Sequence, residues 1–111
     1  MRVANKTLLT SGDMSGNITS DKFPLNQVYG YSIAAIYTGS PVGSLKLQGS
    51  NDPDSANVTN WDDIDDSAQA VSGAGIGMWN YNGAFYLWVR VVYTFTSGSG
   101  LLNLIVNSKG N

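Results

Sequence analysis

The chain has 111 residues, a formal net charge of −2 and only 13% charged residues. This length suits one domain with its own apolar core. Histidine, cysteine and glutamate are absent, so every one of the eight acidic residues is an aspartate. The commonest general base, the thiolate ligands of zinc and the usual bidentate calcium ligand are therefore missing. We expect no enzyme, no catalytic residue and no cofactor.

The basic residues are scattered singly along the chain, at Arg2, Lys6, Lys22, Lys46, Arg90 and Lys109. Because they form no patch, nucleic acid is not an expected partner. The longest apolar run is too short for a membrane span, so no membrane is expected either. The N-terminal "MRVANKTLLTSG" lacks the apolar core of a signal peptide, and we expect a chain made in the cytoplasm.

Strand patterns dominate, since no window keeps an apolar 3.6-residue period over three turns. The expected strands cover residues 3–9, 16–20, 27–38, 44–50, 68–72, 78–81, 84–96 and 101–108. Gly30 indicates a bulge, and residues 97–100 would turn the last two strands into a hairpin. The sequence predicts an all-β fold, a single antiparallel β-sandwich (jelly-roll-like) of about eight strands.

Alternation along these strands predicts a core of Ile36, Leu45, Leu47, Val89, Val91, Leu102 and Leu104. Residues 1–111 are expected to form one domain. Residues 10–20 are rich in Ser, Gly and Asn, so 1–20 is alternatively an extended N-terminal arm that orders on a neighbour.

The strand over 84–96 is apolar on both faces, whereas an ordinary sandwich strand has one polar face. Either segments of the same chain or another subunit must cover its second face. Tryptophan, tyrosine and arginine are the residue types that anchor interfaces. We therefore expect a homo-oligomer or a contact with a larger protein through Tyr86, Trp88, Arg90 and Val92.

The stretch "LKLQGSNDPDSANVTNWDDI" runs from a strand into a loop rich in Asn and Asp, and it allows three interpretations. A hard metal ion would use Asp52, Asp54 and Asp62, although the spacing is not that of an EF-hand and no metal is expected. A glycan would use an aromatic platform of Trp61, Trp79 and Tyr81 beside Asn80. The third interpretation is a sandwich corner stabilised by Asx turns, with Trp61 anchoring the next strand, and we favour it.

One set of residues resembles the discoidin-like, galactose-binding-type sandwiches. In that group a strand ends in Ser-Asx-Asp, a Trp follows, and a later strand carries a hydrophobic-Arg-hydrophobic run. The matching positions here are Ser50, Asn51, Asp52, Trp61, Ala84, Tyr86, Val89, Arg90 and Val91. Phe85 departs from the pattern because an arginine is common there. The resemblance implies a β-sandwich and leaves its function open.

A second resemblance, spread over much of the chain, is to small virion proteins of tailed bacteriophages. The residues that carry it are 38–52 ("TGSPVGSLKLQGSND"), Trp79-Asn80, 89–100 ("VRVVYTFTSGSG"), Leu102-Asn103 and Lys109-Gly110. It implies a virion structural protein, which we expect to be a capsid-associated decoration or auxiliary head protein. Its partners would then be itself or the major capsid protein. The alternative is a receptor- or carbohydrate-binding module of a tail or head fibre, with a glycan as its ligand.

Overall fold

In a computed structural model of the chain, the described residues are 2–25, 28–53, 56–82 and 86–110, and they form ten strands. Within these ranges there is no helix that is long and apolar enough to cross a bilayer. The strands are β1 Arg2–Asp13, β2 Ile18–Thr19, β3 Phe23–Pro24, β4 Val28–Gly39, β5 Val42–Ser50, β6 Asp62–Asp63, β7 Gln69–Ser72, β8 Gly75–Asn82, β9 Trp88–Ser97 and β10 Gly100–Gly110.

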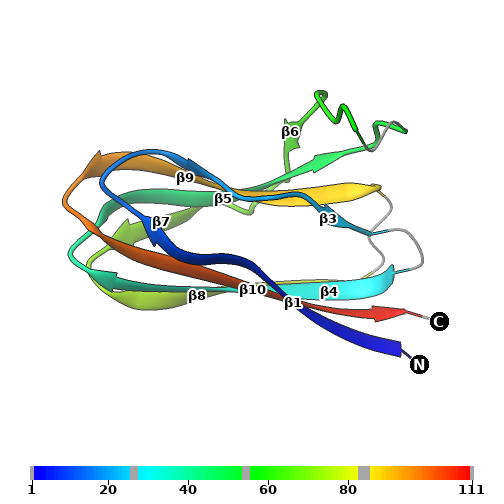
Figure 1. The fold of residues 1–111 in the computed structure, drawn as a ribbon, viewed down its shortest axis with the longest axis horizontal. Coiled ribbons are helices and arrows are strands. Elements are labelled where there is room, and N and C mark those ends of the chain that lie inside the picture. The colour runs from blue at the N-terminus through cyan, green and yellow to red at the C-terminus, as the bar shows by residue number, and fades with distance from the viewer. Residues whose placement is uncertain (1, 26–27, 54–55, 83–85, 111) are drawn as a thin grey trace.

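Strands from the first half of the chain pair with strands from the second half in nested order. β1 pairs with β10, β2 and β3 with β9, β4 with β8, and β5 with β7, all antiparallel. The β4–β10 and β5–β9 pairs complete two sheets. Sheet A has the order β1-β10-β4-β8 and sheet B the order β2-β9-β5-β6, and they stack as two layers (Figure 1). Nested pairing of this kind defines a jelly roll, so the predicted fold class is confirmed.

The core lies between the two sheets and contains most of the residues predicted for it. Leu45, Leu47, Val89, Val91, Leu102 and Leu104 are buried, which confirms those six. The prediction for Ile36 is wrong, because its neighbours Ile33 and Ala35 point inward and Ile36 lies half-buried on the outside of sheet A. Strand β4 is apolar on both faces, so alternation alone does not identify its inner face.

The predicted hairpin of the last two strands is also wrong. β9 belongs to sheet B and β10 to sheet A, so the turn between them crosses from one layer to the other. Gly98 has a positive φ of 79°, and a Cβ there would lie 2.1 Å from the carbonyl oxygen of Ser40. The backbone N–H of Ser40 donates to Ser99 O at 2.9 Å. The β9–β10 turn therefore packs against the turn between β4 and β5, which crosses the layers at the same end.

Residues 1–20, considered above as an arm, run along the fold where they are described. β1 pairs with β10 along its length, with register shifts on either side of Leu9. Met14 is fully buried, and β2 pairs with Val92 and Tyr93 of β9.

In β4, the register against β10 shifts between Gly30 and Val28, which places an irregularity where Gly30 predicted a bulge.

Replacing Leu47 by alanine should lower the free energy of unfolding by about 2–5 kcal/mol, because this fully buried side chain fills the core between the sheets. Urea denaturation followed by tryptophan fluorescence measures the loss. Ile76→Ala is the control, since Ile76 is 70% exposed and its truncation should change stability by less than about 0.5 kcal/mol. Equal losses for the two variants would contradict the assigned inner and outer faces.

Candidate binding surfaces on the two outer faces

The outer face of sheet B carries a cluster that unites residues from three separate sequence hypotheses. Trp88 and Arg90 were predicted for an interface, Trp61 for a glycan platform and Asp52 for a metal. The indole Nε1 of Trp88 donates to the backbone oxygen of Asp52 at 3.0 Å. The guanidinium of Arg90 lies over the ring of Trp61, 4.2 Å from its centroid. The loop between β5 and β6 is thereby held against β9.

The side chain of Asp52 organises this loop from within. One carboxylate oxygen accepts hydrogen bonds from the backbone N–H groups of Thr59 (2.7 Å) and Asn60 (2.9 Å), and the other accepts from Asn60 Nδ2 (2.8 Å). The hydrogen bonds from Asn60, followed by that from Thr59, lower the pKa of Asp52. The Nε1 of Trp61 donates to Val58 O at 3.0 Å. These contacts close the loop on itself and stabilise the corner, although the Asp52 carboxylate accepts N–H groups seven and eight residues on, whereas an Asx turn spans two.

The described aspartates that were proposed as metal ligands accept hydrogen bonds from the chain itself. Asp52 is engaged in the loop, Asp62 accepts the backbone N–H of Asp63, and Asp54 lies outside the described residues. Among the residues that are described, no group of three or more acidic side chains could hold a metal ion. The hydrogen bonds of Asp52 therefore give it a structural role in the β5–β6 loop.

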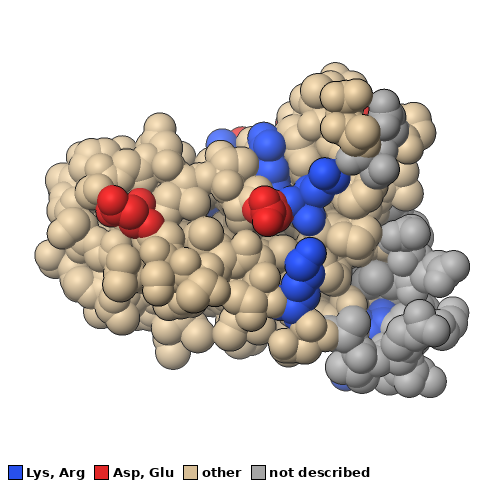
Figure 2. Space-filling view, viewed as in Figure 1, with Lys and Arg blue, Asp and Glu red and all other residues tan. Residues whose placement is uncertain are grey.

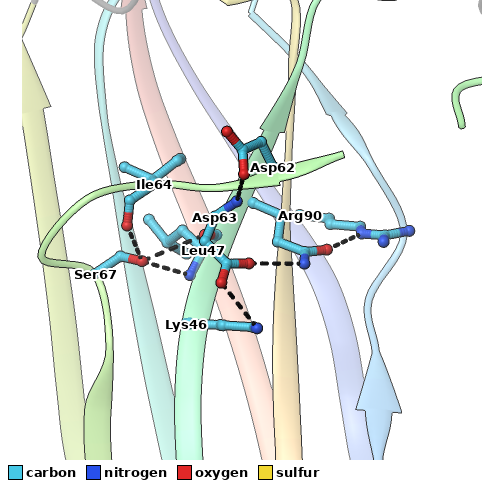
Figure 3. Close-up of polar contacts among 8 residues, drawn as sticks. Lys46, Leu47, Asp62, Asp63, Ile64, Ser67 and Arg90 are labelled. Carbon is cyan, nitrogen blue, oxygen red and sulfur yellow. Dashed lines mark hydrogen bonds and ion pairs between the residues drawn. The ribbon is translucent and has the colours of Figure 1, made fainter. Parts of the chain in front are cut away.

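A chain of polar contacts crosses sheet B beside the corner (Figure 3). Nε of Arg90 donates to Gln48 Oε1 at 2.9 Å, and Gln48 Nε2 donates to Asp63 Oδ1 at 2.9 Å. Lys46 forms an ion pair of 3.1 Å with Asp63, and the two donors, Gln48 first, lower the pKa of Asp63. Within the described ranges Arg90 makes no ion pair, because its contacts are the Gln48 amide and the Trp61 ring.

Ser67 has a structural role that the sequence did not suggest. It is buried, and its hydroxyl accepts the N–H of Leu47 at 3.0 Å and donates to Ile64 O at 2.7 Å (Figure 3). Its carbonyl oxygen accepts Nε1 of Trp79 at 2.7 Å. Ser67 thereby joins sheet B to a tryptophan from sheet A. A single serine between aspartates and alanine has no pattern from which this role could be predicted.

The predicted glycan platform is not formed. Trp79 is only 4% exposed and belongs to the core, so its selection as a ligand-binding surface is wrong. Tyr81 stacks on Tyr31 between the sheets, with ring centroids 5.4 Å apart, whereas Asn80 is exposed on the outside of sheet A. Trp61 lies on sheet B. The strand β8 alternates inward and outward, which separates Trp79 and Tyr81 from Asn80.

The four predicted interface residues also divide into two groups. Trp88, Arg90 and Val92 are half-buried on the outer face of β9. Tyr86 precedes β9 in a bend, packs against the core and shares a hydrogen bond between hydroxyl groups with Tyr31. The premise that Tyr86 shares a face with the other three is therefore wrong, because the strand begins only at Trp88.

Two open grooves flank the β5–β6 loop. A groove of about 570 Å³ is lined largely by aspartates and by Tyr86. A second groove of about 320 Å³ lies between this loop, the segment that joins β2 to β3, and β9. Its lining includes the cations Lys22 and Arg90, the indole of Trp61 and the carboxylate of Asp21. We call the second one the cationic groove.

The outer face of sheet A differs sharply in chemistry from that of sheet B. Ile76 is 70% exposed, Met78 54% and Leu101 46%. Pairing across β8, β4 and β10 places them on the same side as Ala34, Ile36 and Ile105. The other outward positions of these strands, from 32 to 38, 76 to 80 and 101 to 107, are Ser, Thr or Asn, so the surface is uncharged. We call it the neutral face; Asp13 and Lys109 lie at its margins.

Comparisons with known proteins support the fold. No protein-family model and no curated protein matches the chain. The crystal structure of the SPBc2 prophage-derived protein YomS matches with a TM-score of 0.58 at 12% identity, covering 97% of this chain and 96% of that one. The crystal structure of PirA matches with a TM-score of 0.51 at 16% identity, covering 96% and 93%. The chain thus has the fold of these two proteins; the resemblance to discoidin-type modules is not confirmed by them.

Trp88→Phe should lower the melting temperature, because it keeps an aromatic ring but leaves the backbone oxygen of Asp52 without its donor. The loss should be about 1 kcal/mol. Calorimetry measures stability, and light scattering on the same samples measures mass. A variant with unchanged melting temperature and weakened self-association would instead show that Trp88 acts at an interface between subunits.

The β5–β6 loop should loosen at acidic pH. The pKa of Asp52 in the folded protein lies below its ordinary value of 3.8, so its stabilising effect is complete above that value and disappears as the pH falls through the folded pKa. Tryptophan fluorescence, followed from pH 6 to pH 2, should report this change before global unfolding, because both Trp61 and Trp88 contact this loop. Asp52→Ala should show the loosened signal at every pH, and an unchanged titration in this variant would contradict the assignment.

Proposed function

We propose that the protein is a non-enzymatic structural component of a bacteriophage particle, bound to the capsid as a decoration protein. Its jelly-roll fold is one that viral capsid proteins use often, although the same fold also serves lectins and enzymes. One structural match is a prophage-derived protein, which fits this setting. The sequence resemblance to small virion proteins points the same way.

The neutral face is the observation that carries this proposal. Large apolar side chains on a water-exposed sheet cost solubility unless something covers them. Depletion of charge and the presence of methionine are typical of interface centres. Each fully covered Ile, Leu or Met contributes about 1.5–3 kcal/mol. A chain that attaches to a lattice through Ile76, Met78 and Leu101 explains why the charged side chains of β5 and β9 lie on the opposite sheet.

The absence of catalysis is part of the same proposal. The sequence has no histidine, cysteine or glutamate. The carboxylates of Asp52 and Asp63 accept hydrogen bonds that stabilise the corner and the surface of sheet B, and these bonds lower their pKa values. A general acid needs the opposite shift, toward neutral pH.

An interface through Trp88, Arg90 and Val92 remains a second proposal for attachment. The sequence suggested that this face of the strand must be covered. The β5–β6 loop of the same chain contacts Trp88 and Arg90 there, so no second subunit is needed to cover these two side chains. Val92 is half-buried next to β2. For this reason we place the principal attachment surface on sheet A.

The alternative function, a receptor- or carbohydrate-binding module, is favoured by one observation. Trp61, one of the predicted platform residues, lines a groove. That groove is the cationic one, and it lies on sheet B, away from the neutral face. A glycan site there is compatible with attachment through sheet A.

Copy number in purified particles distinguishes the two functions. A decoration protein should be present in tens to hundreds of copies distributed over the head. Quantitative mass spectrometry measures the copy number, and antibody labelling in electron micrographs measures the location. A few copies clustered at the tail or at a single vertex would overturn the decoration role in favour of the adhesin.

A double substitution tests the attachment surface. Ile76→Asp with Met78→Asp places two charges on the neutral face and should reduce binding to particles that lack the protein by at least about tenfold, or roughly 1.4 kcal/mol. The matched control is Ala70→Asp with Thr94→Asp, which adds the same charge at exposed positions of sheet B. Equal binding by both variants would contradict attachment through sheet A.

A further inference from the structure

The cationic groove contains an arginine whose charge is not balanced locally. Nε of Arg90 donates to the neutral amide of Gln48, and the guanidinium plane lies on Trp61. Burial lowers the pKa of Arg90, which indicates that the side chain has lost part of its hydration. The guanidinium is therefore partly dehydrated but still reaches solvent, so an anion can approach it.

Among the described residues, the neighbouring aspartates do not supply that anion. Asp63 is occupied by Lys46 and Gln48, and Asp52 by the amides of its own loop. Asp21 lines the groove, yet no ion pair joins it to Arg90 or Lys22 in the part of the chain that the structure describes. Two cations and one carboxylate leave a formal charge of +1 in a protein whose net charge is −2.

A second cation lies at the same groove. Lys22 sits over the ring of Trp88, 5.5 Å from its centroid, and it lines the groove together with Arg90. Each cation is thus positioned by an indole. Basic side chains also gather near the middle of the face drawn in Figure 2, around a single acidic group, while most of that face is uncharged.

We propose that the cationic groove is a binding site for a carboxylate-bearing saccharide, with Arg90 as the principal contact to the carboxylate. Arginine presents a planar fork of donors that matches a carboxylate in a bidentate manner. Lys22 adds a second positive charge at the groove. This proposal goes beyond the structural role of the particle protein and does not depend on it.

The lining favours a sugar acid over an acidic peptide. Besides the cations it offers the hydroxyl of Thr59, the carboxylate of Asp21 and the indole of Trp61. A hydroxyl and a carboxylate pair with the many hydroxyl groups of a sugar, and an indole packs against its C–H face. The groove is open and about 320 Å³ in volume, which suits one or two sugar rings rather than a buried small molecule.

Titration with a galacturonic acid trisaccharide tests the proposal. Binding is followed by tryptophan fluorescence and by calorimetry at low salt, and the methyl ester of the same trisaccharide serves as the uncharged ligand. We expect the acid to bind at least tenfold more tightly than the ester. Arg90→Gln should weaken binding of the acid at least tenfold, whereas Asp21→Asn, which removes the one negative charge of the lining, should strengthen it.

The matched control is Lys109→Gln, which makes the same charge change on sheet A and should leave the affinity within twofold of the parent. Circular dichroism and melting temperature establish that every variant is folded. Equal affinities for acid and ester, or no loss in folded Arg90→Gln, would overturn the site. Equal binding of a tetra-aspartate peptide or of inorganic phosphate would overturn the saccharide as its ligand. None of these outcomes affects particle attachment, which is measured on the opposite sheet.

Discussion

The pairing of each strand in the first half of the chain with one in the second half is the constraint on which the other features depend. It brings β1 against β10, β4 against β8 and β5 against β7, and it leaves one side of every strand facing the other layer. Once Leu47 and Leu104 point inward, their neighbours along each strand must point outward. The corner at Gly98 is possible because a glycine adopts the positive φ that a crossing beside Ser40 requires.

The two outer faces that result have different chemistry. Sheet B carries the ion pair of Lys46 with Asp63 and the stacked Arg90, and a loop covers part of it. Sheet A presents a neutral surface whose exposed side chains include Ile76 and Met78. A particle protein that docks through one layer and leaves the other free needs such a division. The proposed attachment surface and the proposed saccharide site are separated by the whole thickness of the core.

Much of the fold could be predicted because polar and apolar residues alternate cleanly in some strands. Lys46 and Gln48 alternate with Leu45 and Leu47, which identifies the inner face of β5 without any structure. The same reasoning failed for Ile36 and for the hairpin after β9, since strands that are apolar on both faces do not reveal which side is buried or which sheet they join. Trp79 and Trp61 illustrate the limit for the site: both stand next to an asparagine in the sequence, yet one fills the core and the other contacts an arginine. Contacts between residues far apart in the sequence determine whether such a tryptophan is buried in the core or lies on the surface.

The pairing of β1 with β10 has a consequence for folding during synthesis. The two ends of the domain lie side by side at one end of the sandwich (Figure 1), and they belong to the strands of this domain that are synthesised earliest and latest. In sheet A the order is β1-β10-β4, so the late strand occupies the place between two early ones. Contacts that span most of the chain form slowly, because a long loop must close before they contribute. Until residues 100–110 are translated, β1 therefore has no partner in sheet A and β4 can pair only with β8.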